Sequence, residues 1–178
     1  VRESEKKNIA IIHQHLALFP ALSIAENIFL GNENAKNSVI DWKLTIRRAA
    51  ELMERVGLHE NPETKIRDLG VGKQQLVEVC KAISKNVRLL ILDEPTTGLH
   101  FHDINKLLAA FNALIERGHT IVIVEHNMDV IKCADWVVDL GPEAGTGGGR
   151  VVFEGTPRNL EQCPASYTGK YLRLRTKL

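Results

Sequence analysis

Two adjacent acids close a short apolar run, and they are the residues best placed to do chemistry. Leu89 to Leu92 lead into Asp93 and Glu94, and Pro95 follows at once. The apolar run predicts a strand buried on both faces of a parallel sheet. Pro95 has no N–H and cannot extend a central strand, so we expect the acids at the sheet's carboxyl edge, where ligands bind. One carboxylate there can hold a metal ion through water while its neighbour polarises an attacking water. The alternative is an acidic turn after a buried strand.

The residues after Pro95 favour the catalytic interpretation. Residues 89–100 resemble the Walker B strand and D-loop of the ATP-binding-cassette (ABC) ATPases. This resemblance implies ATP and Mg²⁺ as cofactors, with Asp93 as the magnesium-associated carboxylate and Glu94 as the general base. His100 stands where transporters usually carry an aspartate, so the end of the motif is closer to the DNA-repair members.

Composition excludes several classes of protein. The chain has 178 residues with 44% hydrophobic and 25% charged residues, as expected for one soluble globular domain. Its net charge of +1 gives no global attraction to nucleic acid or to an anionic membrane. No apolar stretch approaches the length of a membrane span, and residues 1–7 are too charged for a signal peptide. Cys80, Cys133 and Cys163 are scattered, which indicates a reducing cytosol and a cytoplasmic protein.

A glutamine near the start of the chain is a second candidate. Residues 8–12 predict a short apolar strand that ends at His13, Gln14 and His15. Residues 9–14, together with residues 22–31, resemble the Q-loop region of sugar-importing ABC ATPases. The resemblance implies that Gln14 reaches the magnesium ion and the attacking water. It also implies that the next segment faces a membrane permease, which would place the protein on the inner face of the plasma membrane. From the residues themselves, Ser23 and Glu26 predict a capping box at a helix start.

The segment from residue 41 to 56 predicts an amphipathic helix, which Asp41 caps and Gly57 ends. Trp42 and Met53 fall on its apolar side, so we expect both in the core.

A glycine-rich segment opens the next helix. Free N–H groups at such a start can bind an anion, although composition alone favours a turn that caps a core helix. The segment resembles the ABC signature motif in its sugar-importer form, which implies contact with the γ-phosphate of a nucleotide held by a second ABC ATPase domain. It differs from the usual motif by a glycine in place of serine and a lysine in place of glutamine. Its residues are Leu69, Gly70, Val71, Gly72 and Lys73.

The later part of the chain continues as helix and strand. Residues 104–115 predict a core-facing helix that Gly118 ends, and residues 120–124 predict another buried strand. His126 follows this strand and is expected at the sheet's carboxyl edge. By resemblance it is the H-loop histidine, which hydrogen-bonds to the γ-phosphate; the alternative is an ordinary polar residue.

Two branches of the superfamily share the chain. Residues 1–95 resemble ribose- and xylose-type sugar-importer ATP-binding proteins, and residues 96–178 resemble the C-terminus of the excinuclease A family. The two resemblances meet within residues 91–96, which both branches have in common. We consider two hypotheses, a recombinant or mis-assembled cassette and a natural divergent ATPase.

The expected fold is therefore α/β: a P-loop NTPase-like ABC ATPase domain with a parallel sheet and an inserted helical subdomain. We expect a helical and signature subdomain over residues 15–87 and an α/β core over residues 88–178. No Gly-x4-Gly-Lys-Ser/Thr sequence occurs in the 178 residues, so the Walker A strand and the N-terminal β-subdomain are expected to be missing. Unpaired strand edges would then favour association.

The leading functional hypothesis is an ATPase subunit that couples ATP hydrolysis to carbohydrate import. The first alternative is a DNA-repair ATPase that recognises damaged DNA, and the second is an inactive chimeric fragment. Because no Walker A motif is present, we expect the isolated chain not to hydrolyse ATP.

Overall fold

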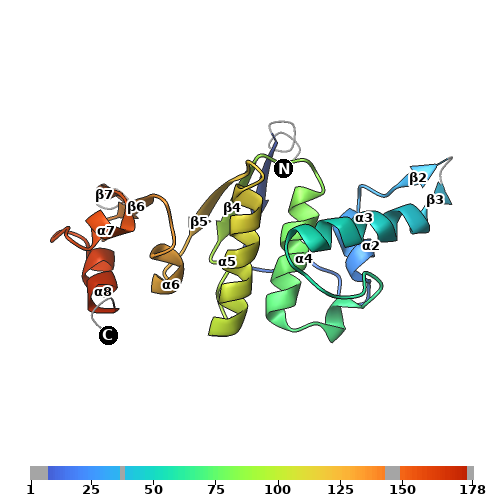
Figure 1. Ribbon diagram of the computed structural model, residues 1–178, viewed down its shortest axis with the longest axis horizontal. Coiled ribbons are helices and arrows are strands. Elements are labelled where there is room, and N and C mark those ends of the chain that lie inside the picture. The colour runs from blue at the N-terminus through green and yellow to red at the C-terminus, as the bar shows by residue number, and fades with distance from the viewer. Residues whose placement is uncertain (1–7, 37–38, 143–148, 176–178) are drawn as a thin grey trace. The chain divides into compact units, whose positions relative to one another are not determined.

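The structure is a computed structural model that describes residues 8–36, 39–142 and 149–175. The chain forms two compact units, Val1–Val124 and Glu125–Leu178, which are treated separately below (Figure 1). Among the described helices, none combines the length and the apolar character needed to cross a bilayer.

A three-stranded parallel sheet organises the first unit. The strand order is β1-β4-β5, and residue Ile91 of the middle strand pairs with Ile11 on one side and Val122 on the other. Within the described residues β1 and β5 are the outer strands, and the association expected from exposed edges stays a prediction. The strands are β1 (Ile9–Ile12), β4 (Leu89–Asp93) and β5 (Thr120–Val124).

The prediction that β4 and β5 are buried strands is wrong for one face of the sheet. On β4 only alternate residues are fully buried, with Leu90 and Leu92 at 1% and 0% exposure. On β5, Val122 and Val124 are 47% and 51% exposed. Among the described residues α4 (Val71–Ile83) packs against β1 and α5 (Phe101–Ile115) packs against β5. These helices bury only the sheet face that carries Leu90 and Leu92. An apolar run predicts a strand, but it does not show whether a second layer of structure covers the other face of the sheet.

The helices of the first unit begin and end where local chemistry predicts. Ser23 and Glu26 form the capping box: the Glu26 N–H donates to Ser23 Oγ at 3.2 Å, and the Ser23 N–H donates to Glu26 Oε2 at 2.6 Å. Asp41 caps the next helix by accepting the Leu44 N–H at 2.9 Å, and Gly57 follows it at φ +69°. The elements are α2 (Ile24–Phe29), β2 (Ala35–Lys36), β3 (Val39–Ile40), α3 (Trp42–Arg55), the 3₁₀ turn η1 (Ile66–Asp68), α4 (Val71–Ile83) and α5 (Phe101–Ile115).

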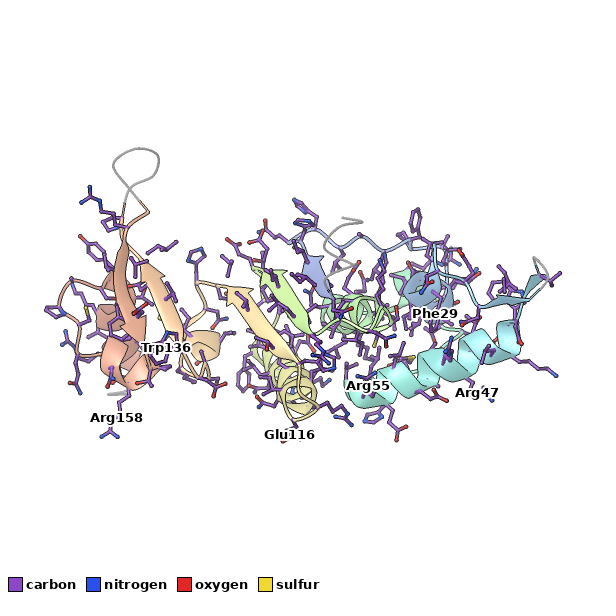
Figure 2. The ribbon with its side chains drawn as sticks, turned by 90° about the horizontal axis from the view of Figure 1, so that it is seen from above. Phe29, Arg47, Arg55, Glu116, Trp136 and Arg158 are labelled. Carbon is purple, nitrogen blue, oxygen red and sulfur yellow. The ribbon has the colours of Figure 1, made fainter. Side chains whose placement is uncertain are left out.

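One continuous core lies between these helices and the sheet. Met53 is buried as expected, but Trp42 is half exposed because it occupies the first turn of α3, at the end of the helix. Figure 2 shows Phe29 among the packed helices and Arg47 on the outer side of α3.

The second unit has its own small core. Its two strands pair antiparallel, and Ile131, Leu160 and Leu172 pack beneath them. The carboxylate of Asp139 accepts hydrogen bonds from Ser166 Oγ at 2.5 Å and from a threonine at the start of the last helix. The elements are α6 (Met128–Ile131), β6 (Val137–Leu140), β7 (Val151–Gly155), α7 (Pro157–Leu160) and α8 (Tyr167–Arg175).

A buried carboxylate on α4 makes the stability of the first unit depend on pH. Glu78 is only 7% exposed, and its Oε1 atom has no hydrogen-bond partner among the described residues. Burial raises the pKa of the Glu78 carboxyl above its ordinary value, while the Lys81 ammonium and the Ala17 backbone N–H act in the opposite direction. Ionising Glu78 is therefore costlier in the folded chain than in the unfolded chain.

We predict that Glu78→Gln is more stable than the parent at neutral pH. The folded-state pKa of Glu78 is raised, so the parent loses stability as pH climbs from the ordinary value of 4.5 through the raised value. Urea unfolding at about pH 4 and about pH 7.5 should show the variant's advantage growing with pH. The exposed Glu54→Gln on α3 serves as the matched control and should show a constant difference. An equal advantage for Glu78→Gln at both pH values would contradict the prediction.

Candidate functional site

The structure joins two of the candidate residues directly. Gln14 lies two residues beyond β1, and Glu94 follows β4 at once. Because these strands are parallel neighbours, their carboxyl ends meet at one edge of the sheet. There the Gln14 Nε2 atom donates a hydrogen bond of 2.9 Å to Glu94 Oε2, across 80 residues of sequence.

Glu94 adopts a left-handed backbone conformation, with φ at +44°. Such a conformation costs a residue other than glycine about 1–3 kcal/mol and survives only where the surroundings hold it. The Glu94 N–H donates to the carbonyl of Val124 at 2.9 Å, and the Thr97 N–H donates to the Glu94 carbonyl at 3.2 Å. This turn fixes the direction of the Glu94 side chain at the sheet edge.

Thr97 also contacts the Glu94 carboxylate, a role that the sequence reasoning missed. Its Oγ1 atom donates to Glu94 Oε2 at 3.2 Å, so the oxygen that accepts from Gln14 also accepts from Thr97. The available signal was the spacing: a threonine three residues after an acid, in a turn, can hydrogen-bond back to it.

Asp93 ends β4 and its side chain is exposed. Magnesium is usually held by one or two carboxylates, with phosphate and water oxygens completing its shell. No group of three or more potential metal-ligating acid, histidine or cysteine side chains occurs among the described residues. The side chains of Asp93 and Gln14 each carry an oxygen of the kind that magnesium prefers as a ligand.

The signature segment lies at the start of α4, where Gly70 is the N-cap. Val71 is 52% exposed, whereas Leu69 is buried, and the Leu69 carbonyl accepts Gln74 Nε2 at 2.8 Å. The Lys73 ammonium forms an ion pair with Glu60, which offsets part of the charge expected to attract phosphate. The structure thus pairs Gln14 with Glu94, whereas the Lys73 side chain pairs with Glu60.

Gly72 has a packing role that the sequence reasoning did not include. It is buried, and a Cβ atom built on it would lie 2.6 Å from the Cβ of Asp103 in the first turn of α5. Only a residue without a side chain allows α4 and α5 to approach so closely. Gly70 has open space around the same position.

We predict that Gly72→Ala lowers the free energy of unfolding by about 1–3 kcal/mol, because the added methyl group must push α5 away. Gly70→Ala is the matched control and should cost less, since it changes only the N-cap preference. Urea unfolding of the two variants measures the difference. Equal losses would show that the close approach at Gly72 carries no energetic weight.

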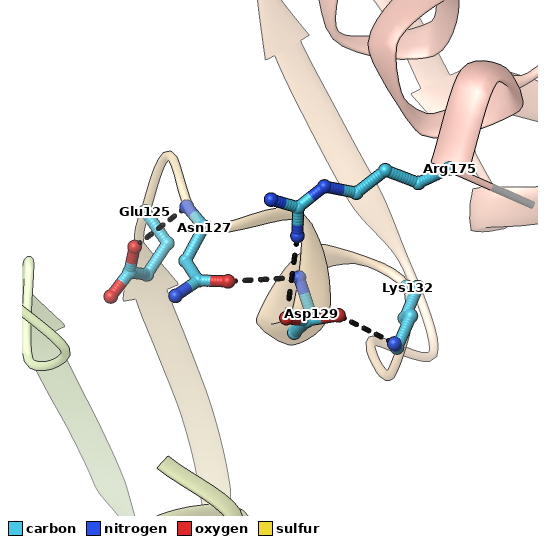
Figure 3. Close-up of polar contacts among 5 residues, drawn as sticks. All are labelled: Glu125, Asn127, Asp129, Lys132 and Arg175. Atoms are coloured by element: carbon cyan, nitrogen blue, oxygen red, sulfur yellow. Dashed lines mark hydrogen bonds and ion pairs between the residues drawn. The ribbon is translucent and has the colours of Figure 1, made fainter. Parts of the chain in front are cut away.

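His126 belongs to the second unit and is exposed there. Its backbone N–H donates to Glu125 Oε2 at 2.9 Å, and the N–H of Asn127 donates to the same oxygen at 3.0 Å. Asn127 in turn caps α6 by accepting the Asp129 N–H (Figure 3). The Glu125 carboxylate therefore fixes the backbone of the turn that carries His126.

The Asp129 carboxylate anchors the other side of this turn. It accepts a hydrogen bond from Lys132 Nζ at 2.6 Å and lies 3.3 Å from Arg175 of α8 (Figure 3). The hydrogen bond from Lys132 is the main cause that holds the pKa of Asp129 below its ordinary value. These exposed pairs tie α6 to the last helix with a modest energy.

Residues 1–97 match the family model described as ABC transporter, which is more than half of the chain. The chain belongs to the ABC transporter family. It is 50% identical over 141 residues to the L-arabinose transport ATP-binding protein AraG of Geobacillus stearothermophilus, covering 79% of this chain and 28% of that protein. It is 47% identical over 159 residues to the UvrABC system protein A of Bradyrhizobium diazoefficiens, covering 87% of this chain and 16% of that protein.

Solved structures show the same fold. UvrA2 from Deinococcus radiodurans matches with a TM-score of 0.60 at 33% identity, covering 87% of this chain and 18% of that one. The ADP conformation of MJ1267, an ATP-binding cassette of an ABC transporter, matches with a TM-score of 0.65 at 22% identity, over 76% of this chain and 58% of that one. The ABC ATPase fold and both resemblances stated from the sequence are confirmed. The chain spans less than a third of either curated relative.

Proposed function

We propose that the chain is part of an ABC ATPase that couples ATP hydrolysis to carbohydrate import. The contact between Gln14 and Glu94 at the carboxyl edge of β1 and β4 carries the proposal. It brings a carboxylate and an amide, 80 residues apart in the chain, to the edge where parallel α/β sheets bind ligands.

In this proposal Glu94 accepts a proton from the attacking water, and Gln14 orients that water against the carboxylate. Bound magnesium supplies positive charge that offsets the charge of the phosphates, and Asp93 and Gln14 are the residues that would hold it. His126 and the segment from Leu69 to Lys73 donate hydrogen bonds toward phosphate oxygens. The fixed turn at Glu94 limits the motion of the base, which favours proton transfer in one geometry.

The importer assignment rests on similarity to AraG, a protein described as an L-arabinose transport ATP-binding protein. The proposed partners are a second ABC ATPase domain, which would supply the opposing nucleotide, and a membrane permease. The protein would then work in the cytoplasm, bound to the inner face of the plasma membrane.

We predict that Glu94→Gln abolishes most phosphate release while nucleotide binding persists. The measurement uses the protein expressed from the whole reading frame that carries these residues, with ATP and Mg²⁺. Loss of a general base should lower the rate by about 10²–10⁴-fold. Lys106→Met, an exposed change on α5, is the control and should leave the rate unchanged. The isolated 178-residue chain is expected to be inactive. Steady ATP hydrolysis by this chain that is lost in its Glu94→Gln variant would contradict that expectation.

Similarity to UvrABC system protein A over 87% of the chain supports a second candidate function, a DNA-repair ATPase. We predict, under the importer proposal, that the protein does not retain damaged duplex DNA on a filter at about 0.15 M salt. Retention that falls steeply as salt rises would instead support the repair function, because phosphate contacts release counterions. If neither hydrolysis nor DNA binding is found, the chain is an inactive fragment.

A further inference from the structure

The segment between β1 and α2 has no helix or strand over residues 13–22, yet it carries Gln14. A backbone without regular structure must satisfy its polar groups elsewhere. The Pro20 and Leu22 carbonyls accept the backbone N–H groups of Arg67 and Ile66 in η1. Side chains of α2 and α4 hold two other positions of the segment, Phe19 and Ala17.

Ala17 is held through its backbone carbonyl. Lys81 Nζ, on α4, donates to the Ala17 carbonyl at 2.7 Å. Lys81 and Ala17 are 64 residues apart in the chain, so this bond ties the segment to α4.

Phe19 is held in the same way by α2. The Phe19 N–H donates to Asn27 Oδ1 at 2.7 Å, and Asn27 Nδ2 donates to the Phe19 carbonyl at 3.1 Å. Asn27 is fully buried, and its Nδ2 atom also donates to the Ser23 carbonyl at 2.8 Å. A buried amide with this many partners holds its neighbours in one arrangement, because breaking any bond leaves a desolvated polar group.

We propose that Lys81 and Asn27 are positioning residues that set where Gln14 lies against Glu94. The proposal rests on the function proposed for Gln14. Ala17 is three residues from Gln14, and three residues of fully extended chain span at most about 10 Å. A shift of α4 is therefore passed to Gln14 through a short tether.

The test measures the Gln14 side-chain amide by ¹⁵N NMR in the 178-residue chain. The signal in Glu94→Ala gives the reference position for a lost contact. In Lys81→Met we expect the Gln14 signal to move toward that reference. We also expect the Phe19 backbone amide to exchange about fivefold to tenfold faster, as for the loss of one hydrogen bond.

Matched variants separate positioning from general destabilisation. Lys81→Arg keeps a donor and should show the parent signal. Lys106→Met on α5 should change nothing. A Gln14 signal that stays in place while the Phe19 amide exchanges faster would overturn the proposal, and so would unchanged exchange.

These readings need no catalysis, so the two proposals can fail separately. If the Gln14 signal moves as expected in Lys81→Met but the Glu94→Gln enzyme stays active, the proposed base is rejected and the positioning residues are supported. If the Glu94→Gln enzyme is inactive but the Gln14 signal does not change in Lys81→Met, the proposed base is supported and the positioning residues are rejected.

Discussion

The parallel pairing of β1 with β4 is the constraint on which the candidate site depends. Their backbone hydrogen bonds place the last residues of both strands at one edge. Gln14 and Glu94 meet there because the chain leaves both strands on the same side of the sheet. Without this register the two side chains, far apart in sequence, would share no surface.

At that edge the Glu94 carboxylate is held by a backbone conformation that costs free energy. The left-handed backbone at Glu94 is offset by the bonds of its N–H to Val124 and of its carbonyl to Thr97. The side chains of Gln14 and Thr97 then converge on a single oxygen of Glu94. Under the proposed function, an attacking water would meet side chains that are already oriented, and such preorganisation lowers the barrier to phosphoryl transfer.

The sequence predicted the features that depend on near neighbours. The caps at Ser23 and Asp41, and the end of a helix before Gly57, involve residues within a few positions of each other, so propensity and spacing are enough. The pairing of Gln14 with Glu94 was accessible only through resemblance, because spacing alone does not set strand order. The resemblance also supplied the expectation for His126, which remains a proposal.

Features that depend on distant surfaces were out of reach. Half of β5 is exposed because no described layer covers one face of the sheet, and a run of valine and isoleucine does not report that. The ion pair between Lys73 and Glu60 and the contact of Gly72 with Asp103 join segments whose approach is decided by helix packing. In both cases the residue type was noticed, but its partner was unknown.

The middle strand β4 also bears on how such proteins can recombine during evolution. The resemblances to the two branches that were noted in the sequence meet around its end, and β4 pairs with β1 on one side and β5 on the other. Those ladders are made of backbone atoms, which are the same whatever the side chains. A crossover between two distant genes at this strand would keep every ladder bond, so the strand is a natural joint for evolutionary exchange and for designed grafts.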